Sequence, residues 1–511
     1  MAIQPVPLTA TSIALGLALL TLGTAGVVLA HGQGLRLTQA DAAALRFTLL
    51  QAALSAMVSV ILAIPVARAL ARRRFVGRGL LVTLLGAPFL LPVIVAVLGL
   101  LAVFGRAGWV NQVLGLTGLP PVSIYGLQGV VMAHVFLNLP LATRMILQGW
   151  QAIPAERLRL AAALDLPPAE VFRHLEWPML LVVLPGAAIT VFTICLTSFA
   201  VALTLGGGPA ATTIELAIYQ ALRFDFDLGH AASLAALQFA ISAVAAFVAW
   251  QLALAFGFGA GLDRGYRMAP GGWRRGADAV VIGLAALFLL LPLTAIVLRG
   301  VAGLGDLPAS VWPAAVRSLL VAIPSALMAT GAALVLALAV ARGGQRWLDL
   351  AALLPLATSG LVLGTGLFLL VQPVFPVARV ALPVTLLVNA ALALPFVYRL
   401  ILPEAQALHR DYDRLSSALH LRGITRTMLI TLPRLARPLG FGAGVAAALS
   451  LGDLGVIALF AGEAQATLPL VIHRLMGAYR MEAAAGAALL LVLMGFALFA
   501  LFDLGGRRAA T

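Results

Sequence analysis

Apolar residues run along this chain in long stretches, which short polar or charged segments separate. A membrane-spanning helix needs about 20 apolar residues, and about twelve runs of the 511-residue chain reach that range. Lipid offers the backbone no hydrogen bonds, so spans are helices or a closed barrel. The runs lack the alternation of barrel strands. The pattern therefore predicts an all-α integral membrane protein with about 12 transmembrane helices, at 10–31, 43–70, 79–105, 124–147, 182–205, 229–257, 278–299, 312–341, 349–372, 381–402, 437–461 and 483–504.

Composition strengthens this prediction and changes how the charge is interpreted. The chain is 62% hydrophobic and 10% charged, whereas soluble chains are about 25% charged. Its formal net charge is +14, and all 33 basic residues are arginine. In a soluble protein this excess would suggest nucleic acid. In a membrane protein, loop arginines set the orientation and meet anionic lipid headgroups, so we expect lipid contact and no nucleic-acid partner.

The arginines also indicate an orientation. With the N-terminus placed inside, most of them fall in inner loops, as Arg72, Arg157 and Arg410 do, while fewer, such as Arg106, fall outside. The positive-inside rule then places both termini in the cytoplasm. The first run is either a signal peptide or a retained helix. Because no basic residue precedes Arg36, it lacks the charged start of a signal peptide, and we expect it to be retained.

The chain contains an internal repeat. Residues 139–178 align without a gap with 394–433, about 255 residues later, and the match includes charged positions. Upstream segments match loosely at a larger offset, so the first half has extra residues, which we expect in an outer loop near 105–123. An even number of spans separates the copies. The two halves are therefore expected to form a parallel repeat, with a transport path between them.

Each copy carries a polar loop on the inner side. The first reads "AAALDLPPAEVFRHLEWP" over 161–178. Pro167 and Pro168 end one helix, because proline removes a donor and clashes inside a helix, and Pro168 can begin the next. The small alanines permit close approach by another molecule. A solvated loop without a partner is the alternative, but two copies on one face favour a pair of docking elements for a dimeric cytoplasmic partner.

These loops resemble the EAA motif of ABC importer permeases, which reads Glu-Ala-Ala, three residues, Gly, nine residues, Ile-x-Leu-Pro. The second copy ends in "ITLP" (430–433), a full match, and the first in "LEWP" (175–178), a partial one. Where the family has its glycine, this chain has Asp165 and His420, and the family's glutamate falls on Arg159 and Arg414. In the family the loop forms a coupling helix that sits in a cleft of the ATP-hydrolysing subunit.

Two further stretches, 197–232 and 449–480, resemble the fused, two-domain permeases of thiamine importers, and this resemblance covers nearly the whole chain. It implies two tandem type I permease domains with coupling loops near 153–178 and 408–433. The expected organisation is a helix and outer loop (1–42), the first domain (43–257), a cytoplasmic linker (258–277), an added helix and outer loop (278–311) and the second domain (312–505).

By this resemblance the chain is a transport subunit of a bacterial inner-membrane importer for thiamine or thiamine phosphates. A periplasmic binding protein would deliver the small-molecule substrate, and a separate dimeric ATPase would hydrolyse ATP. The residues expected to couple to that ATPase are Ala162, Ala163, Leu164, Asp165, Ser417, Ala418, Leu419 and His420. A fused permease for ferric iron or another small solute is the alternative within the same class.

Ionisable or polar residues inside membrane spans are functional candidates. Asp453 in "SLGDLG" is the strongest, and it aligns with Ser198 in the repeat. A buried carboxylate would suit a cationic thiazolium, whereas the alternative is a structural acid bonded to nearby backbone. Asn138 and Asn389 either line the path or bond between helices. We expect Glu215 and Glu463 at the outer rim, where they contact a binding protein or are solvated.

Several chemistries find no support in the sequence. The chain has no lysine, so its glycine-rich segments are not phosphate-binding P-loops. There is no zinc-site pattern, and the single Cys195, in an apolar run, suggests a buried small side chain. We therefore expect no catalytic residue, cofactor or metal. A secondary transporter driven by an ion gradient is the rival class, but it would need a relay of midplane acids or histidines, and few are present.

Overall fold

Every regular element that the computed structural model describes is a helix. It describes residues 8–32, 38–85, 91–252, 272–343, 345–421 and 423–509. The first half contains α1 (Leu8–Ala18), α2 (Thr24–His31), α3 (Gln39–Arg72), α4 (Arg78–Leu84), α5 (Val93–Phe104), α6 (Trp109–Leu116), α7 (Leu127–Ala152), α8 (Ala155–Ala163), α9 (Pro168–Val171), α10 (Trp177–Leu196), α11 (Phe199–Leu205), α12 (Ile214–Gln220) and α13 (Leu228–Leu252). The second contains α14 (Trp273–Gly303), α15 (Val311–Gly343), α16 (Arg346–Leu353), α17 (Gly360–Val371), α18 (Val377–Ala418), α19 (Gly423–Arg426), α20 (Leu432–Leu451), α21 (Gly455–Phe460), α22 (Leu468–Gly477) and α23 (Met481–Ala509).

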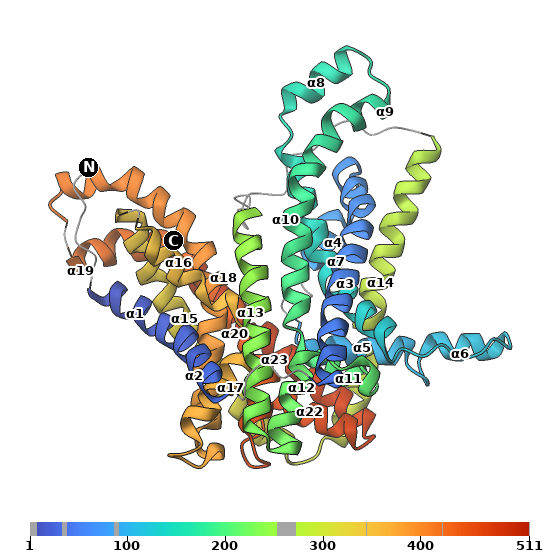
Figure 1. Ribbon diagram of the computed structural model, residues 1–511. Coiled ribbons are helices and arrows are strands. Elements are labelled where there is room, and N and C mark those ends of the chain that lie inside the picture. Colours follow the sequence, from blue (N-terminus) through green and yellow to red (C-terminus); the bar gives the residue numbers. More distant parts are fainter. Residues whose placement is uncertain are drawn as a thin grey trace. The chain divides into compact units, whose positions relative to one another are not determined.

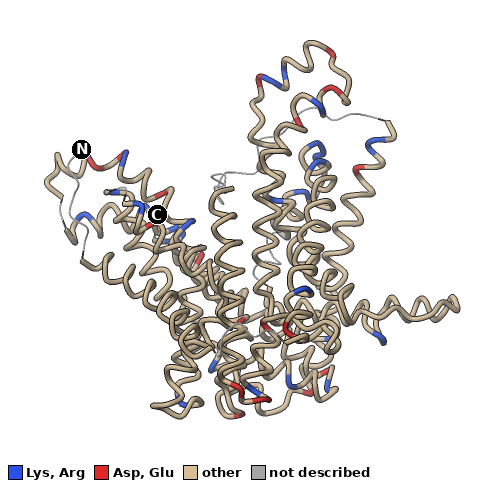
Figure 2. Tube along the Cα trace, viewed as in Figure 1, with Lys and Arg blue, Asp and Glu red and all other residues tan. Residues whose placement is uncertain are grey.

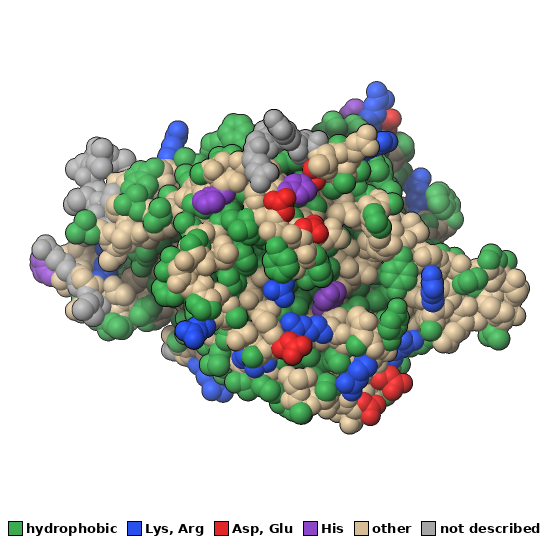
Figure 3. Space-filling model, turned by 60° about the horizontal axis from the view of Figure 1, so that its bottom comes forward, with side chains coloured by type: hydrophobic (Ala, Val, Ile, Leu, Met, Phe, Trp, Pro, Cys, Tyr) green, Lys and Arg blue, Asp and Glu red, His purple; other side chains and the backbone are tan. Residues whose placement is uncertain are grey.

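These helices confirm the predicted membrane protein. Within the described residues, 11 helices are long and apolar enough to span a membrane, or 12 if the pair 346–357 and 360–371, bent by 91°, counts as one span. Charged residues gather at helix ends and loops, with long uncharged stretches between them (Figure 2). Large apolar side chains such as Leu15, Leu62 and Leu284 remain exposed, and hydrophobic side chains cover much of the face in Figure 3. Lipid would solvate such surfaces.

At 79–105 and in the outer loop that follows, the structure differs from the prediction. The structure has α4, α5 and then α6, a short helix where a loop was expected. The Asn111 amide explains this local order, because it donates to Gly105 O and Val122 O at 2.9 Å each and accepts from Val122 N at 2.8 Å. These bonds connect α6 to the segments before and after it, at Gly105 and Val122. The predicted linker 258–277 lies largely outside the described residues, and α14 begins at Trp273.

The structure repeats the sequence duplication element by element. α8 and α18 end 255 residues apart, and the same offset joins α9 to α19 and α10 to α20. It also joins two π-helical turns, η3 (Phe172–Glu176) and η8 (Thr427–Thr431). Between the starts of α5 and α17 the offset is 267. The extra residues of the first half therefore lie between α5 and the loop, where α6 has no counterpart.

The described residues form two compact units that do not follow chain order. The smaller unit contains 42–213 and 245–301. In it, α14 packs on the first-half helices: Ala295 shares a buried cluster with Ala102 and Val103 of α5. Phe288 also meets Phe136 of α7 edge to face, with ring centroids 5.9 Å apart. A helix from the start of the second half therefore completes a core made of first-half elements (Figure 1).

In the larger unit the reverse occurs, because helices of the first half pack on helices of the second half. It contains 1–41, 214–244 and 302–511. Here α1 packs on α15 and α16, and α2 packs on α17. Gly366 of α17 makes this approach possible, because a Cβ there would lie only 2.6 Å from Thr24 Cβ. The predicted domains follow the sequence duplication rather than these spatial units, and their boundaries stay a prediction.

Candidate functional site

The first polar loop is a helical turn that projects beyond the spans of the smaller unit (Figure 1). Pro154 follows the C-cap of α7 and is the N-cap of α8. After α8 the backbone turns through Asp165, whose φ is 48°. Leu166 N donates to Ala161 O at 3.0 Å, and Asp165 N to Ala162 O at 3.1 Å. This is a Schellman cap, which satisfies the last carbonyls of the helix.

The second loop ends in the same turn but begins differently. α18 runs without interruption from the span into the loop, because His409 stands where the first copy has Pro154. The helix ends at Ala418, and the backbone then turns through His420, whose φ is 52°. Leu421 N donates to Ser416 O at 2.9 Å and His420 N to Ser417 O at 3.2 Å. Both loops therefore present the same cap from differently supported helices.

All eight residues predicted to couple to a partner are exposed. They are Ala162, Ala163, Leu164, Asp165, Ser417, Ala418, Leu419 and His420. The two leucines are matched, with 62% of Leu164 and 60% of Leu419 accessible. Exposed apolar side chains at the ends of projecting helices are surfaces that protein partners cover. The structure contains the geometry of paired docking elements, while the coupling role itself stays a prediction.

A buried ion cluster holds the first loop onto its spans. Glu176, which is fully buried, accepts a hydrogen bond from Arg72 Nη2 at 2.8 Å and forms an ion pair with Arg68 Nη2 at 2.7 Å. The Arg68 guanidinium also lies 4.9 Å from the centre of the Phe172 ring. Sequence reasoning missed this cluster, because more than 100 residues separate Glu176 from its partners. The only available signal was the repeat, in which Thr431 takes the place of Glu176.

The two candidate path residues at the repeated helix breaks occupy equivalent positions. Ser198 is the N-cap of α11, without a side-chain capping bond. Asp453 lies between α20 and α21, where its Oδ1 accepts from Gly455 N at 3.2 Å. Its buried Oδ2 has no partner among the described residues. Asp453 thus makes the backbone contact expected of a structural acid, and its other carboxylate oxygen has no hydrogen bond within the described residues.

The two asparagines bond between helices. Asn138 Nδ2 donates to His134 O at 2.9 Å within α7 and contacts Cys195 Sγ of α10 at 3.4 Å. Asn389 Nδ2 donates to Ser450 Oγ of α20 at 3.1 Å. Cys195 is buried, as the sequence suggested. The first and second halves thus place comparable polar bonds at the same helix pair, since Cys195 and Ser450 are 255 residues apart.

The acids expected at the outer rim have different environments. Glu463 is exposed, whereas Glu215 at the start of α12 is fully buried. A solvated side chain or a binding-protein contact is therefore wrong for Glu215, while the location of both acids at the outer rim stays a prediction. Burial raises the pKa of Glu215 to about 8, and hydrogen bonding to Ser359 and Gln238 opposes that rise. Glu215 is thus a neutral acid near neutral pH. The described residues contain no cluster of His, Cys, Asp or Glu that could hold a metal.

The glycine-rich segment beside α11 lines an open pocket of about 530 Å³ in the smaller unit, together with Phe47 and Tyr125. Gly207 and Gly208 have φ of 75° and 137°, which side chains rarely allow. A Cβ on Gly207 would lie 3.0 Å from Tyr125 Cβ. These two glycines therefore let the turn pack closely against Tyr125.

The many apolar helices, the duplicated projecting loops and the polar helix breaks define a multi-pass membrane permease. The chain is 39% identical over 479 residues to the thiamine transport system permease protein ThiP of Salmonella typhimurium, covering 91% of this chain and 89% of that protein. The values for the Escherichia coli protein of that name are the same. For the Haemophilus influenzae protein of that name, identity is 34% over 464 residues, 88% of this chain and 86% of that protein. The chain belongs to the family of thiamine transport system permease proteins.

A more distant relative agrees with the duplication. The molybdenum transport system permease protein ModB of Azotobacter vinelandii is 30% identical over 182 residues, which are 36% of this chain and 80% of that protein. A protein of roughly one copy's length thus matches less than half of the chain. No family model matches the sequence.

Proposed function

We propose that this chain is the permease subunit of an inner-membrane ATP-binding-cassette importer for thiamine or thiamine phosphates. The observation that carries the proposal is the pair of exposed loops 255 residues apart, which share one capped geometry. The relatives named for thiamine transport support the substrate. The chain itself carries the path, and ATP hydrolysis belongs to a separate subunit.

The two loops are the docking elements for an ATPase dimer. A dimer offers two equivalent clefts, and the chain offers two equivalent projections, with Leu164 and Leu419 as matched apolar contacts. Closure of the dimer would move both loops and switch the path between two rigid states. The continuous α18 transmits such movement directly, while the break at Pro154 adds a joint in the first copy.

The orientation follows from the arginines near the loops. We place both termini and both loops in the cytoplasm, since cytoplasmic segments carry the excess of arginine. A periplasmic binding protein then delivers the substrate to the opposite side. The tandem permease domains at 43–257 and 312–505 are part of this proposal.

The candidate path residues are Ser198, Asp453, Asn138 and Asn389. Asp453 is the best supported of them, because its buried Oδ2 has no partner among the described residues and a carboxylate attracts a cationic thiazolium. The asparagines already bond between helices. Their contribution is therefore to hold the helices around the path.

Reconstitution with an ATPase subunit and a periplasmic binding protein from the same organism tests the proposal. Thiamine-loaded binding protein is expected to stimulate ATP hydrolysis above the level with unloaded binding protein. Stimulation by ferric iron or another ligand in place of thiamine would overturn the substrate alone. Uptake by this chain without ATP, under a proton gradient, would establish a secondary transporter and overturn the class.

A further inference from the structure

The base of each loop contains an arginine at the end of a long span. In the smaller unit, Arg72 at the end of α3 is paired with the buried Glu176. In the larger unit, Arg342 occupies the corresponding place near the end of α15, in a matching Ala-Arg pair. The counterpart of Glu176 there is Thr431. The second half therefore keeps the arginine and lacks the carboxylate that satisfies it in the first.

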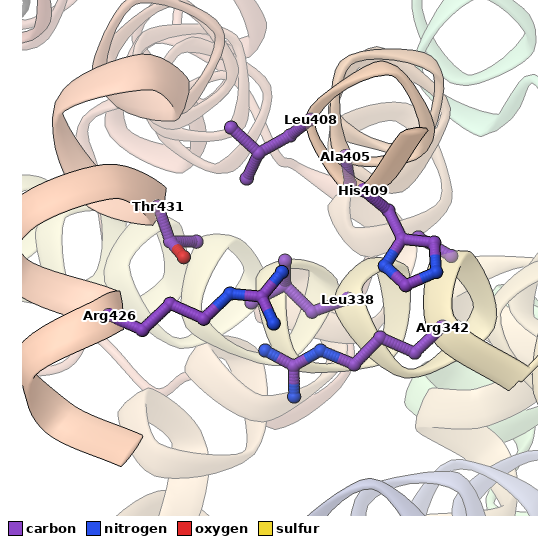
Figure 4. A pocket seen from close by; sticks show the side chains of 8 residues that line it. Leu338, Arg342, Ala405, Leu408, His409, Arg426 and Thr431 are labelled. Carbon is purple, nitrogen blue, oxygen red and sulfur yellow. The ribbon is translucent and has the colours of Figure 1, made fainter. Parts of the chain in front are cut away.

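A small pocket lies where that carboxylate would be. Arg342, His409, Arg426 and Thr431 contribute to its lining, from α15, α18, α19 and η8. The guanidinium groups of Arg342 and Arg426 point toward one another, and the His409 ring lies on the same side (Figure 4). In the first copy the position of Arg426 is held by Val171. The second half has thus exchanged an acid for a neutral residue and gained a cation.

Protein groups leave this positive charge only partly satisfied. Asp413 accepts Arg426 Nη2 at 2.8 Å and lies 3.6 Å from His409 Nδ1. Arg342 makes no ion pair with any carboxylate of the described residues. The buried donor Arg426 Nε and the buried ring nitrogen His409 Nδ1 have no hydrogen-bond partner there. Buried donors without partners cost free energy, and an anion in the pocket would satisfy them.

We propose that this pocket binds a phosphate group. Planar guanidinium groups match the oxygens of phosphate, and the Thr431 hydroxyl can donate as well. The cavity of about 10 Å³ is close to the size needed for one water molecule. One phosphate oxygen therefore enters, and the rest of the group stays at the mouth beside the exposed Arg342. The source is a phospholipid headgroup at the membrane surface or inorganic phosphate.

Thermal unfolding of the full chain, purified in dodecyl maltoside and stripped of lipid, tests this site. Inorganic phosphate and phosphatidylglycerol are titrated separately at constant ionic strength. At least one of them is expected to raise the unfolding temperature. R342Q and R426Q should each increase the apparent Kd about tenfold, as expected for the loss of one charged hydrogen bond. R346Q, which removes an exposed arginine outside the pocket, is the matched control.

Thr431→Glu provides a second variant, which leaves both arginines and the Arg426–Asp413 ion pair in place. It restores the carboxylate of the first half, so it should abolish the response to the probe without lowering the basal unfolding temperature. A response to phosphatidylglycerol alone assigns the site to lipid, and a response to inorganic phosphate assigns it to the free ion. The proposal is overturned if neither probe acts on the wild type, if R346Q weakens the response as much as R342Q, or if T431E still responds.

Discussion

Asp165 and His420 hold backbone conformations that favour glycine. Their φ values of 48° and 52° lie in the left-handed region, where a non-glycine residue costs of order 1 kcal/mol or more. Aspartate and asparagine enter this region more readily than other side chains, because their short polar groups can hydrogen-bond locally. The two loop caps are thus alike in shape and unequal in strain, and that difference arises from one side chain in each loop.

Replacing each residue by glycine should separate the two caps. We expect H420G to raise the free energy of unfolding by about 1 kcal/mol, because glycine removes the strain of the imidazole-bearing Cβ. D165G should change it by less than about 0.5 kcal/mol. Thermal unfolding of both variants in the same detergent measures the difference. Equal effects would show that the local backbone, rather than the side chain, sets the strain.

Glu176 provides a sharper test of residue-level energetics. Replacing it with glutamine leaves two arginines without their shared carboxylate, and breaking a buried ion pair costs about 3–5 kcal/mol. E176Q should therefore lower the unfolding temperature substantially. Glu170→Gln in the same loop is the control, since the Glu170–His174 pair is largely exposed and such pairs contribute about 1 kcal/mol or less. A similar loss in both variants would contradict the buried cluster.

Sequence reasoning at this scale succeeded where the signal was local. The prolines, the small alanines and the glycine-replacing residues were visible as neighbours in the chain, and the structure places them in the expected turn. Glu176 and Glu215 were not understood, because their partners are distant in sequence. Burial of a single acid leaves no pattern in its own neighbourhood.

At the level of elements, equivalent helices of the two copies differ by a single residue. α12 continues into a π-helical turn, η5 (Ala221–Asp225), and ends before Phe226, whose φ is 53°. The equivalent helix α22 has no such turn and ends before Tyr479, with φ of 58°. A π-turn accommodates one inserted residue, so the first copy has gained a residue without losing its terminal cap.

Buried Glu215 makes the packing of α12 pH-dependent. Its folded pKa of about 8 exceeds the ordinary value of 4.5, so the folded state retains a proton that the unfolded state releases. Stability is therefore expected to fall as pH rises from about 4.5 to 8. E215Q should remove this fall, whereas E463Q, at an exposed position, should keep it. Unfolding temperatures measured at pH 5 to 8 give the comparison, and parallel wild-type and E215Q curves would refute it.

The element pattern was largely predictable, because long apolar runs and a 255-residue offset are features of the sequence itself. The spans and the repeated loop follow from them. The short helix α6 in the loop after 79–105 did not, since it depends on the bonds of Asn111 across that loop. The continuity of α18 was also missed, although the replacement of Pro154 by His409 was visible in the alignment.

For the whole molecule, the two loops offer a matched pair of surface variants. L164E and L419E place a charge on side chains that are 62% and 60% exposed, so neither should alter the free energy of unfolding by more than about 0.5 kcal/mol. Both should weaken ATPase assembly and transport. Pull-down of the ATPase and uptake in vesicles measure these effects. Retention of full assembly by both variants would remove the loops as docking elements.

Helix α1–α2 belongs to a unit whose remaining members lie at 214–244 and 302–511. A ribosome makes this helix pair well before the helices it packs on, because α15 to α17 follow about 300 residues later in the chain. At about 5–20 residues per second, tens of seconds pass between the synthesis of α1 and α2 and that of the helices they pack on. During that interval the insertion machinery or lipid must cover small and polar surfaces such as Thr24, which eventually pack against Gly366. The exchange of helices between the halves thus imposes an order on biosynthesis, in which α1 and α2 are made long before they can be packed.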